Sequence, residues 1–160
     1  YYVMQARAKA GAMRGALDII RKYYGAMLEL GATTMWEDFD LEWAKNAKPL
    51  DALLGDGEYD VHGDNGGYCY KGYRHSLCHG WAAGTVSFAT EYILGIKVAE
   101  VGCEKITISP DLGDLTWAEG AFPTPYGNVF VRADKKDGQT VVKYDAPEQI
   151  EVTIVKKEDS

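Results

Sequence analysis

Two ionisable side chains, Glu37 and His79, stand out because of the residues around them. Glu37 follows Trp36 at the end of a helical pattern, where a polar, glycine-rich stretch begins. A carboxylate beside a large aromatic ring, delivered to a loop by a rigid element, is a common arrangement for a general acid or base that acts on a sugar. The plainer interpretation is a solvated glutamate at a helix end. The residue pattern alone leaves both interpretations open.

His79 lies near the start of an apolar run, residues 77–94. The run predicts a helix with Ser76 as its N-cap, and with Glu91 as its only charged residue we expect that helix to be buried almost all round. Glycines at 80 and 84 predict close packing against other helices. From the residues alone, a core histidine is the plainer interpretation of His79, and a ligand-binding histidine is the alternative.

Helical patterns also precede Glu37 and explain how it is positioned. Residues 1–10 and 13–30 predict two helices, which end at Gly11 and Gly31, residues suited to the left-handed position after a helix. In the second helix the apolar residues recur at steps of three and four. They are Met13, Leu17, Ile20, Tyr24, Met27 and Leu28. The polar residues 38–72 predict a long loop after Glu37, and long loops inside compact domains tend to be functional.

After Gly95 the hydrophobic period changes from helical to alternating. Five short strands are predicted, at residues 105–109, 115–122, 128–133, 139–144 and 150–156. Asp137-Gly138 predicts a hairpin, while Pro123 and Pro125 predict a break between the second and third strands. Together these signals predict an antiparallel meander in a β-sandwich. Three aromatic residues of this region are expected in its core or at an interface, with a sugar-binding platform as the alternative: Trp117, Phe122 and Tyr126.

Length, composition and charge set limits on the function. At 160 residues with 46% apolar and 26% charged residues, the chain has the composition of a soluble globular protein with a sizeable core. The net charge of -7 argues against nucleic acid as a partner, because nucleic-acid-binding proteins gather Lys and Arg on one face. No apolar run approaches the ~20 residues that cross a bilayer, and no signal segment opens the chain, so no membrane partner is predicted.

The cysteines and histidines predict neither a disulfide framework nor a metal site. The three cysteines are Cys69, Cys78 and Cys103. An odd count without short-scaffold spacing favours a reducing, cytoplasmic compartment. His62, His75 and His79 lie near two of the cysteines, but they lack the paired close spacing of a structural zinc motif. We therefore expect no metal and no cofactor.

Three separated stretches carry a resemblance to a known family. They are residues 31–37 (GATTMWE), 74–81 (RHSLCHGW) and 115–127 (LTWAEGAFPTPYG), with Leu94-Gly95-Ile96 between the last two. In this order and spacing they resemble the closing part of a bacterial α-L-rhamnosidase of glycoside hydrolase family 78. The similarity runs from Tyr1 to about Tyr144. Three motifs in register are far more specific than any one of them.

The resemblance implies a fold in two parts. Residues 1–97 would be the last helices of an (α/α)6 catalytic barrel, and residues 98–160 a C-terminal antiparallel β-sandwich domain. The barrel would be incomplete, because the residues before the β-region are too few for twelve helices of ~11 to 12 residues. The chain also begins at Tyr1, without an initiator Met and already in a helical pattern. We therefore expect the missing N-terminal part of the barrel to be a partner of this chain.

The resemblance also implies an activity, the hydrolysis of terminal α-L-rhamnosyl bonds with inversion. Glu37 matches the general base of the family, and His79 and Trp36 are expected to contact the substrate, a rhamnose-containing carbohydrate. Trp81 is expected to be a packing residue. The general acid would belong to an earlier barrel segment, so this chain alone is expected to be inactive.

No residue of this chain matches the general acid. Asp38 and Asp40 lie too close to Glu37 in the sequence to replace it, and they are interpreted as loop carboxylates. Two other classes of function stay open. One is a non-catalytic carbohydrate-binding module built on the β-sandwich, and the other is a structural fragment without a ligand.

Overall fold

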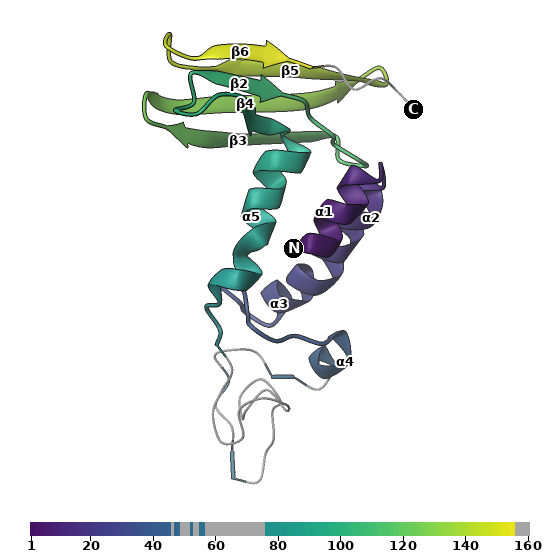
Figure 1. Ribbon diagram of the computed structural model, residues 1–160. Helices are drawn as coiled ribbons and strands as arrows, with labels where there is room; N and C mark the ends of the chain where they lie inside the picture. Colours follow the sequence, from purple (N-terminus) through teal and green to yellow (C-terminus); the bar gives the residue numbers. More distant parts are fainter. Residues whose placement is uncertain (46, 49–51, 53–54, 57–75, 156–160) are drawn as a thin grey trace. The chain divides into compact units, whose positions relative to one another are not determined.

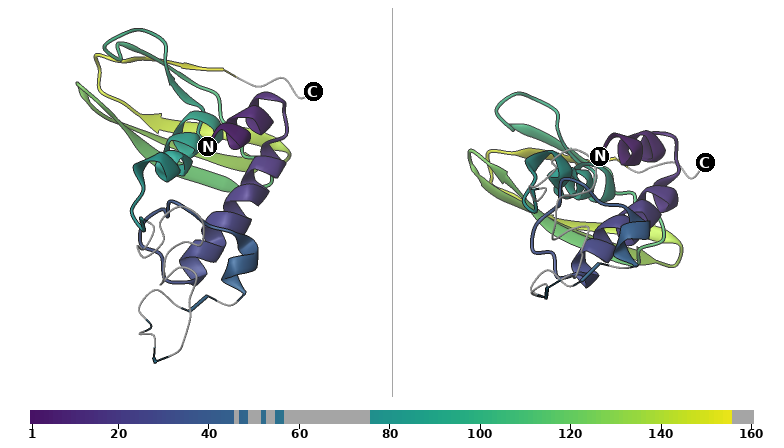
Figure 2. Two further views of the ribbon diagram at one scale, coloured as in Figure 1. Left: turned by 60° about the horizontal axis from the view of Figure 1, so that its bottom comes forward. Right: turned by 90° about the horizontal axis from the view of Figure 1, so that it is seen from below.

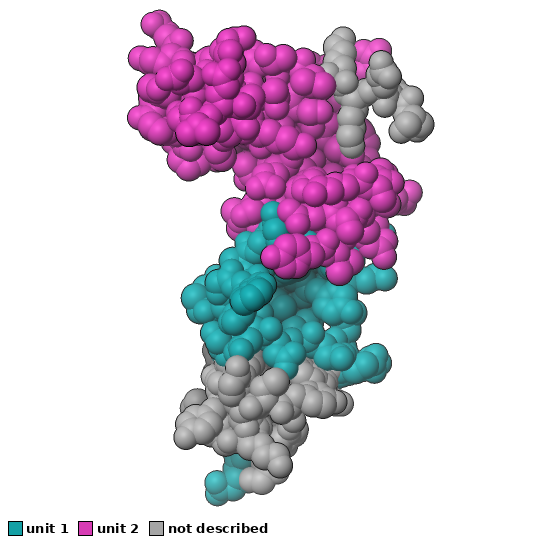
Figure 3. Space-filling model, viewed as in Figure 1, with its two compact units in different colours: residues 1, 17–85 teal, residues 2–16, 86–160 magenta. Residues whose placement is uncertain are grey.

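A computed structural model describes residues 1–45, 47–48, 52, 55–56 and 76–155. Helices come before Gly95 and strands after it, as the change of hydrophobic period predicts (Figure 1). The chain divides into two compact units, which Figure 3 shows in different colours. One unit comprises residue 1 with residues 17–85, and the other residues 2–16 with 86–160. Among the described residues, no helix combines the length and hydrophobicity that crossing a membrane requires.

Four helical segments open the chain: α1 (Tyr2–Lys9), α2 (Met13–Ile19), a π-helical turn (Ile20–Tyr24) and α3 (Gly25–Glu29). The last three follow one another directly, which confirms the predicted helix. Gly11 and Gly31 have φ angles of 76° and 89°, the left-handed conformation predicted for both helix ends. Leu17 and Met27 are buried as expected, but Leu28 is 65% exposed, so its assignment to the buried face is wrong.

The long loop predicted for residues 38–72 contains a short helix, α4 (Leu41–Ala44). The carboxylate of Asp40 accepts a hydrogen bond of 2.8 Å from the backbone N–H of Glu42, which satisfies one of the free donors at the start of this helix. Asp40 is therefore a capping residue. Most of the remaining predicted loop lies outside the described residues.

Three consecutive helical segments lead to the β-region: a 3₁₀ turn (Gly80–Ala83), α5 (Gly84–Phe88) and a π-helical turn (Ala89–Ile93). The prediction that Ser76 caps this helix is wrong, because the helix begins at Gly80 and its N-cap position is His79. The expected near-complete burial is also wrong within this chain, since Trp81 is 79% exposed. At Gly84 a Cβ atom would lie 2.6 Å from the ring of Tyr1, which precedes α1, so a close contact exists there. At Gly80 nothing lies within 4 Å of the Cβ position, so the predicted close packing is wrong for this glycine within the described residues.

In the part of the chain that the structure describes, six strands form two three-stranded sheets (Figure 1, Figure 2). They are β1 (Ile96–Val98), β2 (Lys105–Ile108), β3 (Trp117–Thr124), β4 (Gly127–Lys136), β5 (Gln139–Asp145) and β6 (Glu151–Ile154). The orders are β1-β2-β6 and β3-β4-β5. The second sheet is the predicted antiparallel meander. In the first sheet β2 and β6 run parallel, so the prediction of antiparallel pairing throughout is wrong.

The second sheet has two turns, and the sequence predicts the turn between β4 and β5 correctly but misplaces the start of the turn between β3 and β4. Asp137 and Gly138 have φ angles of 51° and 79° and join β4 to β5, as the hairpin signal predicts. Pro123, however, lies inside β3, opposite Asn128. Proline is tolerated there because β3 is an edge strand, so only Pro125 lies in the turn.

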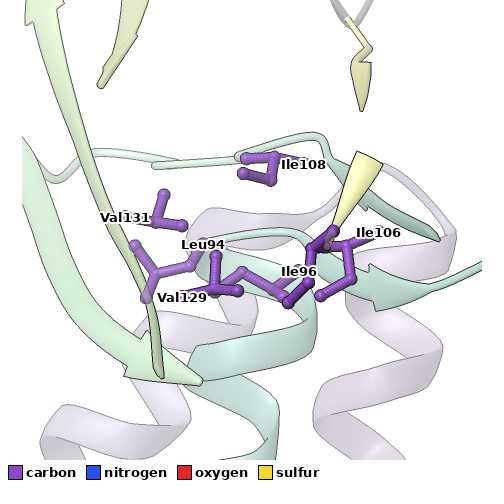
Figure 4. Packing of buried hydrophobic residues seen from close by; sticks show 7 residues of the cluster. Leu94, Ile96, Ile106, Ile108, Val129 and Val131 are labelled. Atoms are coloured by element: carbon purple, nitrogen blue, oxygen red, sulfur yellow. The ribbon is translucent and has the colours of Figure 1, made fainter. Parts of the chain in front are cut away.

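The core of the β-region takes side chains from both sheets (Figure 4). Ile96, Ile106 and Ile108 come from the first sheet, and Val129 and Val131 from the second; all five are at most 2% exposed. The buried residues Leu94 and Ile150 complete this cluster. The alternation of buried and exposed residues along β4 follows from the side-chain period of two in a strand.

Candidate functional site

Glu37 is connected to the segment that carries His79 by two hydrogen bonds. Its backbone N–H donates to the carbonyl oxygen of Ser76 at 2.9 Å, and one of its carboxylate oxygens accepts from the backbone N–H of Ser76, also at 2.9 Å. The side chain of Glu37 is half-buried. A carboxylate that accepts a backbone N–H is fixed in orientation, and such charge-assisted hydrogen bonds are stronger than neutral ones.

Further hydrogen bonds extend this pairing toward His79. The backbone N–H of His79 donates to the carbonyl oxygen of Met35 at 2.8 Å, and the hydroxyl of Thr34 donates to the carbonyl oxygen of Leu77. Residues 34–37 and 76–79 therefore run side by side, and we call this pair of segments the clamp. It brings together two of the three sequence motifs, although nearly forty residues separate them in the chain.

The clamp also explains why the helix starts late. Residues 76–79 direct their backbone groups toward residues 34–37, so they are not available for a helical turn. His79 itself is extended, with φ -110° and ψ 111°, and its carbonyl oxygen accepts the N–H of Ala82 at 3.0 Å. The imidazole of His79 is half-buried and stands at the junction of an extended segment and a helix.

Trp36 is the buried support of the clamp. Its side chain is 2% exposed and belongs to a cluster with the buried Met27 and Ala32, against which Tyr24, Leu30, Phe39 and Leu77 pack. The rings of Trp36 and Phe39 meet edge to face, with centroids 5.9 Å apart. A ring so deeply buried presents almost no surface to a ligand, so the structure gives no support to the prediction that Trp36 contacts the substrate.

Tyr24 lies in the π-helical turn and reaches the helix that follows His79. Its hydroxyl donates to the carbonyl oxygen of Ala82 at 3.2 Å, and partial burial raises the pKa of its hydroxyl above the ordinary value. The sequence predicts Tyr24 only as a member of an apolar helix face. No local signal predicts the roles of Tyr24, Thr34 and Ser76, because each one binds a residue far away in the chain.

The third motif, residues 115–127, contributes β3 and the turn after it. Phe122 packs against the core of the β-region, as predicted. Trp117 and Tyr126 are 50% and 40% exposed, so they do not lie in the core, and an interface or a sugar-binding platform stays a prediction for them. The hydroxyl of Tyr126 donates to the carboxylate of Glu104 at 3.2 Å.

Within the part of the chain that the structure describes, no group of three His, Cys, Asp or Glu side chains is arranged to hold a metal ion. Of the cysteines, Cys78 is exposed and Cys103 half-buried, and both are free thiols. Cys69, His62 and His75 lie outside the described residues.

The chain consists of a helical part followed by a β-region of two sheets, and the β-region matches the model of a known domain family. Residues 95–159 match the model of the bacterial alpha-L-rhamnosidase C-terminal domain, a stretch that includes strands β1 to β6. The resemblance predicted from the three motifs is thereby confirmed for this region. A comparison with curated proteins gives no match.

More particularly, the chain is similar to rhamnosidases of glycoside hydrolase family 78. The GH78 rhamnosidase of Bacillus sp. GL1 is 31% identical, with a TM-score of 0.67 over 96% of this chain and 14% of that one. The α-L-rhamnosidase of Dictyoglumus thermophilum gives 0.67 at 22% identity, over 96% of this chain and 15% of that one. That of Streptomyces avermitilis, complexed with L-rhamnose, gives 0.65 at 21% identity, over 94% and 13%. The chain thus spans 13–15% of the length of these rhamnosidases.

The contribution of Tyr24 can be measured with Tyr24→Phe, for which the exposed neighbour Tyr23→Phe is the matched control. We expect Tyr24→Phe to lower the free energy of unfolding by about 0.5–1.5 kcal/mol, because the carbonyl of Ala82 loses its donor. Tyr23 is 41% exposed, so its variant should stay within about 0.5 kcal/mol of the parent chain. Urea unfolding at neutral pH measures both values, and equal effects would contradict the assigned hydrogen bond.

The raised pKa of Tyr24 adds a test at alkaline pH. Above pH 10, the ordinary pKa, the unfolded chain releases the Tyr24 proton while the folded chain still holds it. Stability contributed by the protonated hydroxyl is therefore lost as pH rises through this range. Tyr24→Phe should show a smaller decline in stability above pH 10 than Tyr23→Phe does.

Proposed function

We propose that this chain is the closing part of a longer, inverting α-L-rhamnosidase. In this proposal residues 1–97 complete an (α/α)6 catalytic barrel, and residues 98–160 form its C-terminal β-sandwich domain. The family match at residues 95–159 and the likeness to GH78 rhamnosidases over most of the chain support it. The substrate would be a glycoside or polysaccharide with terminal α-L-rhamnose. The Streptomyces avermitilis relative was solved with that sugar.

The clamp is the observation that carries the assignment of Glu37 and His79. It holds a half-buried carboxylate and a half-buried imidazole on two adjacent segments that are fixed by backbone hydrogen bonds. Preorganisation of this kind is what catalytic groups require, because misplaced groups lose most of their effect. Glu37 would act as the general base and His79 would hold a sugar hydroxyl.

In the proposed reaction, the carboxylate of Glu37 takes a proton from a water molecule as the water attacks the anomeric carbon. The bond to the leaving oxygen breaks through an oxocarbenium-like state, and a second carboxyl group protonates that oxygen. In an inverting enzyme these two carboxyls lie ~6.5–9.5 Å apart to leave room for the water.

The general acid is assigned to the part of the longer enzyme outside this chain. Asp40 is a poor candidate, because its carboxylate already caps α4. Asp38 is half-buried and directly adjacent to Glu37, and we assign it no step. Trp36 would act indirectly, as the buried support that keeps the backbone of Glu37 in place.

The proposal predicts that the longer enzyme hydrolyses 4-nitrophenyl α-L-rhamnoside, whereas the 160-residue chain alone does not. General acid–base catalysis contributes ~10²- to 10⁴-fold, so a site without its acid should be close to the uncatalysed rate. Release of nitrophenol by the two purified proteins at equal concentration measures this. Turnover by the chain alone that disappears in Glu37→Gln would overturn the assignment of an absent acid, and an inactive longer enzyme would overturn the function.

A further inference from the structure

The sheet β3-β4-β5 has an outer face that faces away from the core of the β-region. On β4, Val129 and Val131 are buried in that core and Ala133 is buried too, so Phe130 and Arg132 point to the opposite side. The strand register aligns these outer side chains in rows across the sheet. One row is Glu119, Arg132 and Lys143, and the next is Ala121, Phe130 and Asp145.

A groove of about 460 Å³ lies between these two rows. Glu119, Arg132 and Lys143 line one side of it, and Phe130 and Asp145 line the other. The inner-face row of Gly120, Val131 and Tyr144 passes between them and provides the floor. A Cβ atom on Gly120 would point to the inner face, where it would lie 2.8 Å from the side chain of Leu94, so the close packing of the core favours glycine here.

Arg132 holds the side chain of Glu119 in the first row in place through an ion pair. Its Nε and Nη2 donate to the carboxylate of Asp134 at 3.0 and 2.8 Å, and its Nη1 donates to Glu119 at 2.7 Å. Its guanidinium lies 4.8 Å from the ring centre of Trp117, so that ring is already stacked. The hydrogen bond from Arg132 lowers the pKa of Asp134 and so keeps this carboxylate ionised.

The second row and Lys143 remain available to a ligand. Phe130 is 51% exposed, and Lys143 and Asp145 are exposed residues. Neither Lys143 nor Asp145 makes an ion pair within the residues that the structure describes. An exposed aromatic ring with a carboxylate in its own row and the Lys143 ammonium in the facing row is suited to a pyranose, whose C–H face covers the ring while its hydroxyls meet the charged groups.

We propose that this groove, here called the Phe130 groove, is an accessory carbohydrate-binding site that takes an α-L-rhamnosyl unit of the substrate. The identity of the sugar rests on the proposed function. A 6-deoxy sugar has a methyl group in place of the hydroxymethyl group of other hexoses, which an exposed ring favours, and its hydroxyls can accept from Lys143 and donate to Asp145. The mixed charges of the two rows suit such a ligand better than an apolar protein partner, since charged residues are depleted at the centre of protein interfaces.

The test is a calorimetric and NMR titration of the 160-residue chain with methyl α-L-rhamnoside. We expect saturable binding in the millimolar range, weakened about tenfold by Phe130→Ala and also weakened by Asp145→Asn. Val141→Ala changes an exposed residue of the same sheet that does not line the groove, and it should leave the affinity unchanged. Melting temperatures within a few degrees of the parent chain would show that the variants are folded.

Three outcomes would overturn the Phe130 groove as a sugar site. They are absence of saturation in the parent chain, equal affinity in Phe130→Ala, and loss of binding in Glu37→Ala in place of Phe130→Ala. If Phe130→Ala lowers the melting temperature of the longer enzyme and leaves its affinity for the sugar unchanged, the sugar-site proposal also fails, and this face is an internal interface of the longer enzyme. Turnover by the longer enzyme reports on the proposed function independently, because the groove lies outside the catalytic residues assigned there.

Discussion

Glu37→Ala in the longer enzyme should lower turnover of 4-nitrophenyl α-L-rhamnoside by about 10²- to 10⁴-fold. The reason is that the attacking water loses its proton acceptor, while protonation of the leaving group is unaffected. Added azide should restore part of the turnover, because azide attacks the anomeric carbon without first losing a proton. The product of rescue would be a rhamnosyl azide, which mass spectrometry identifies.

Glu37 also accepts a hydrogen bond from Ser76, so the variant must be separated from a structural effect. Glu37→Gln is the matched control, because the amide oxygen can still accept the Ser76 N–H but cannot take a proton from water. A catalytic Glu37 predicts equally severe losses in both variants and a melting temperature in Glu37→Gln close to that of the parent. A purely structural Glu37 predicts normal turnover per folded molecule in Glu37→Gln, and no effect of azide on either variant.

Gly95→Ala should be the most destabilising small substitution in the β-region. Gly95 is buried with φ 69°, and a Cβ atom would lie 1.9 Å from the carbonyl oxygen of Ser109. The segments around Gly95 and Ser109 are joined there by a hydrogen bond of 3.0 Å from the N–H of Ser109 to the carbonyl oxygen of Gly95. Alanine must push the backbone of Ser109 away, which disturbs the pairing of β1 with β2. We expect a loss of more than about 4 kcal/mol in the free energy of unfolding.

Gly102→Ala separates the steric clash from the backbone conformation. Gly102 also has a positive φ, 90°, but nothing lies within 4 Å of the position of its Cβ atom. Its alanine variant should therefore lose only about 1–2 kcal/mol, the strain of a left-handed residue with a side chain. Denaturant unfolding of the two variants, followed by circular dichroism, measures the difference. Similar losses would mean that the strand ends separate easily at Gly95.

Much of the local structure could be predicted because it depends on neighbouring residues. The change of period at Gly95, the helix ends at Gly11 and Gly31 and the Asp137-Gly138 hairpin each have a signal within a few residues. Strand β1 has no such signal, because three residues are too few to show an alternation. The parallel partner of β2 could not be predicted either, since parallel pairing depends on a strand far along the chain.

The same distinction applies to the candidate site. The motifs predict Glu37 and His79 as site residues, and this stays a prediction, whereas the predicted helix start at Ser76 is wrong. Ser76 is a typical N-cap residue, but residues 76–79 form hydrogen bonds with residues 34–37 and therefore do not form the first turn of the helix. Burial also depends on distant contacts. Trp36, expected at the ligand, is buried by Met27 and Leu77, whereas Trp81, expected in the core, is exposed within this chain.

The parallel pairing of β2 with β6 has a consequence for the order of folding. β1 and β2 are neighbours in the sequence, and so are β3, β4 and β5, so those antiparallel pairs can form soon after their residues leave the ribosome. The other edge of β2 cannot pair until β6, which comes after β5 in the sequence, has been synthesised. Until then its N–H and C=O groups are an open edge that another chain could pair with. A chain that ends before β6 should therefore expose this edge of β2 and pair with other chains more readily than the chain that contains it.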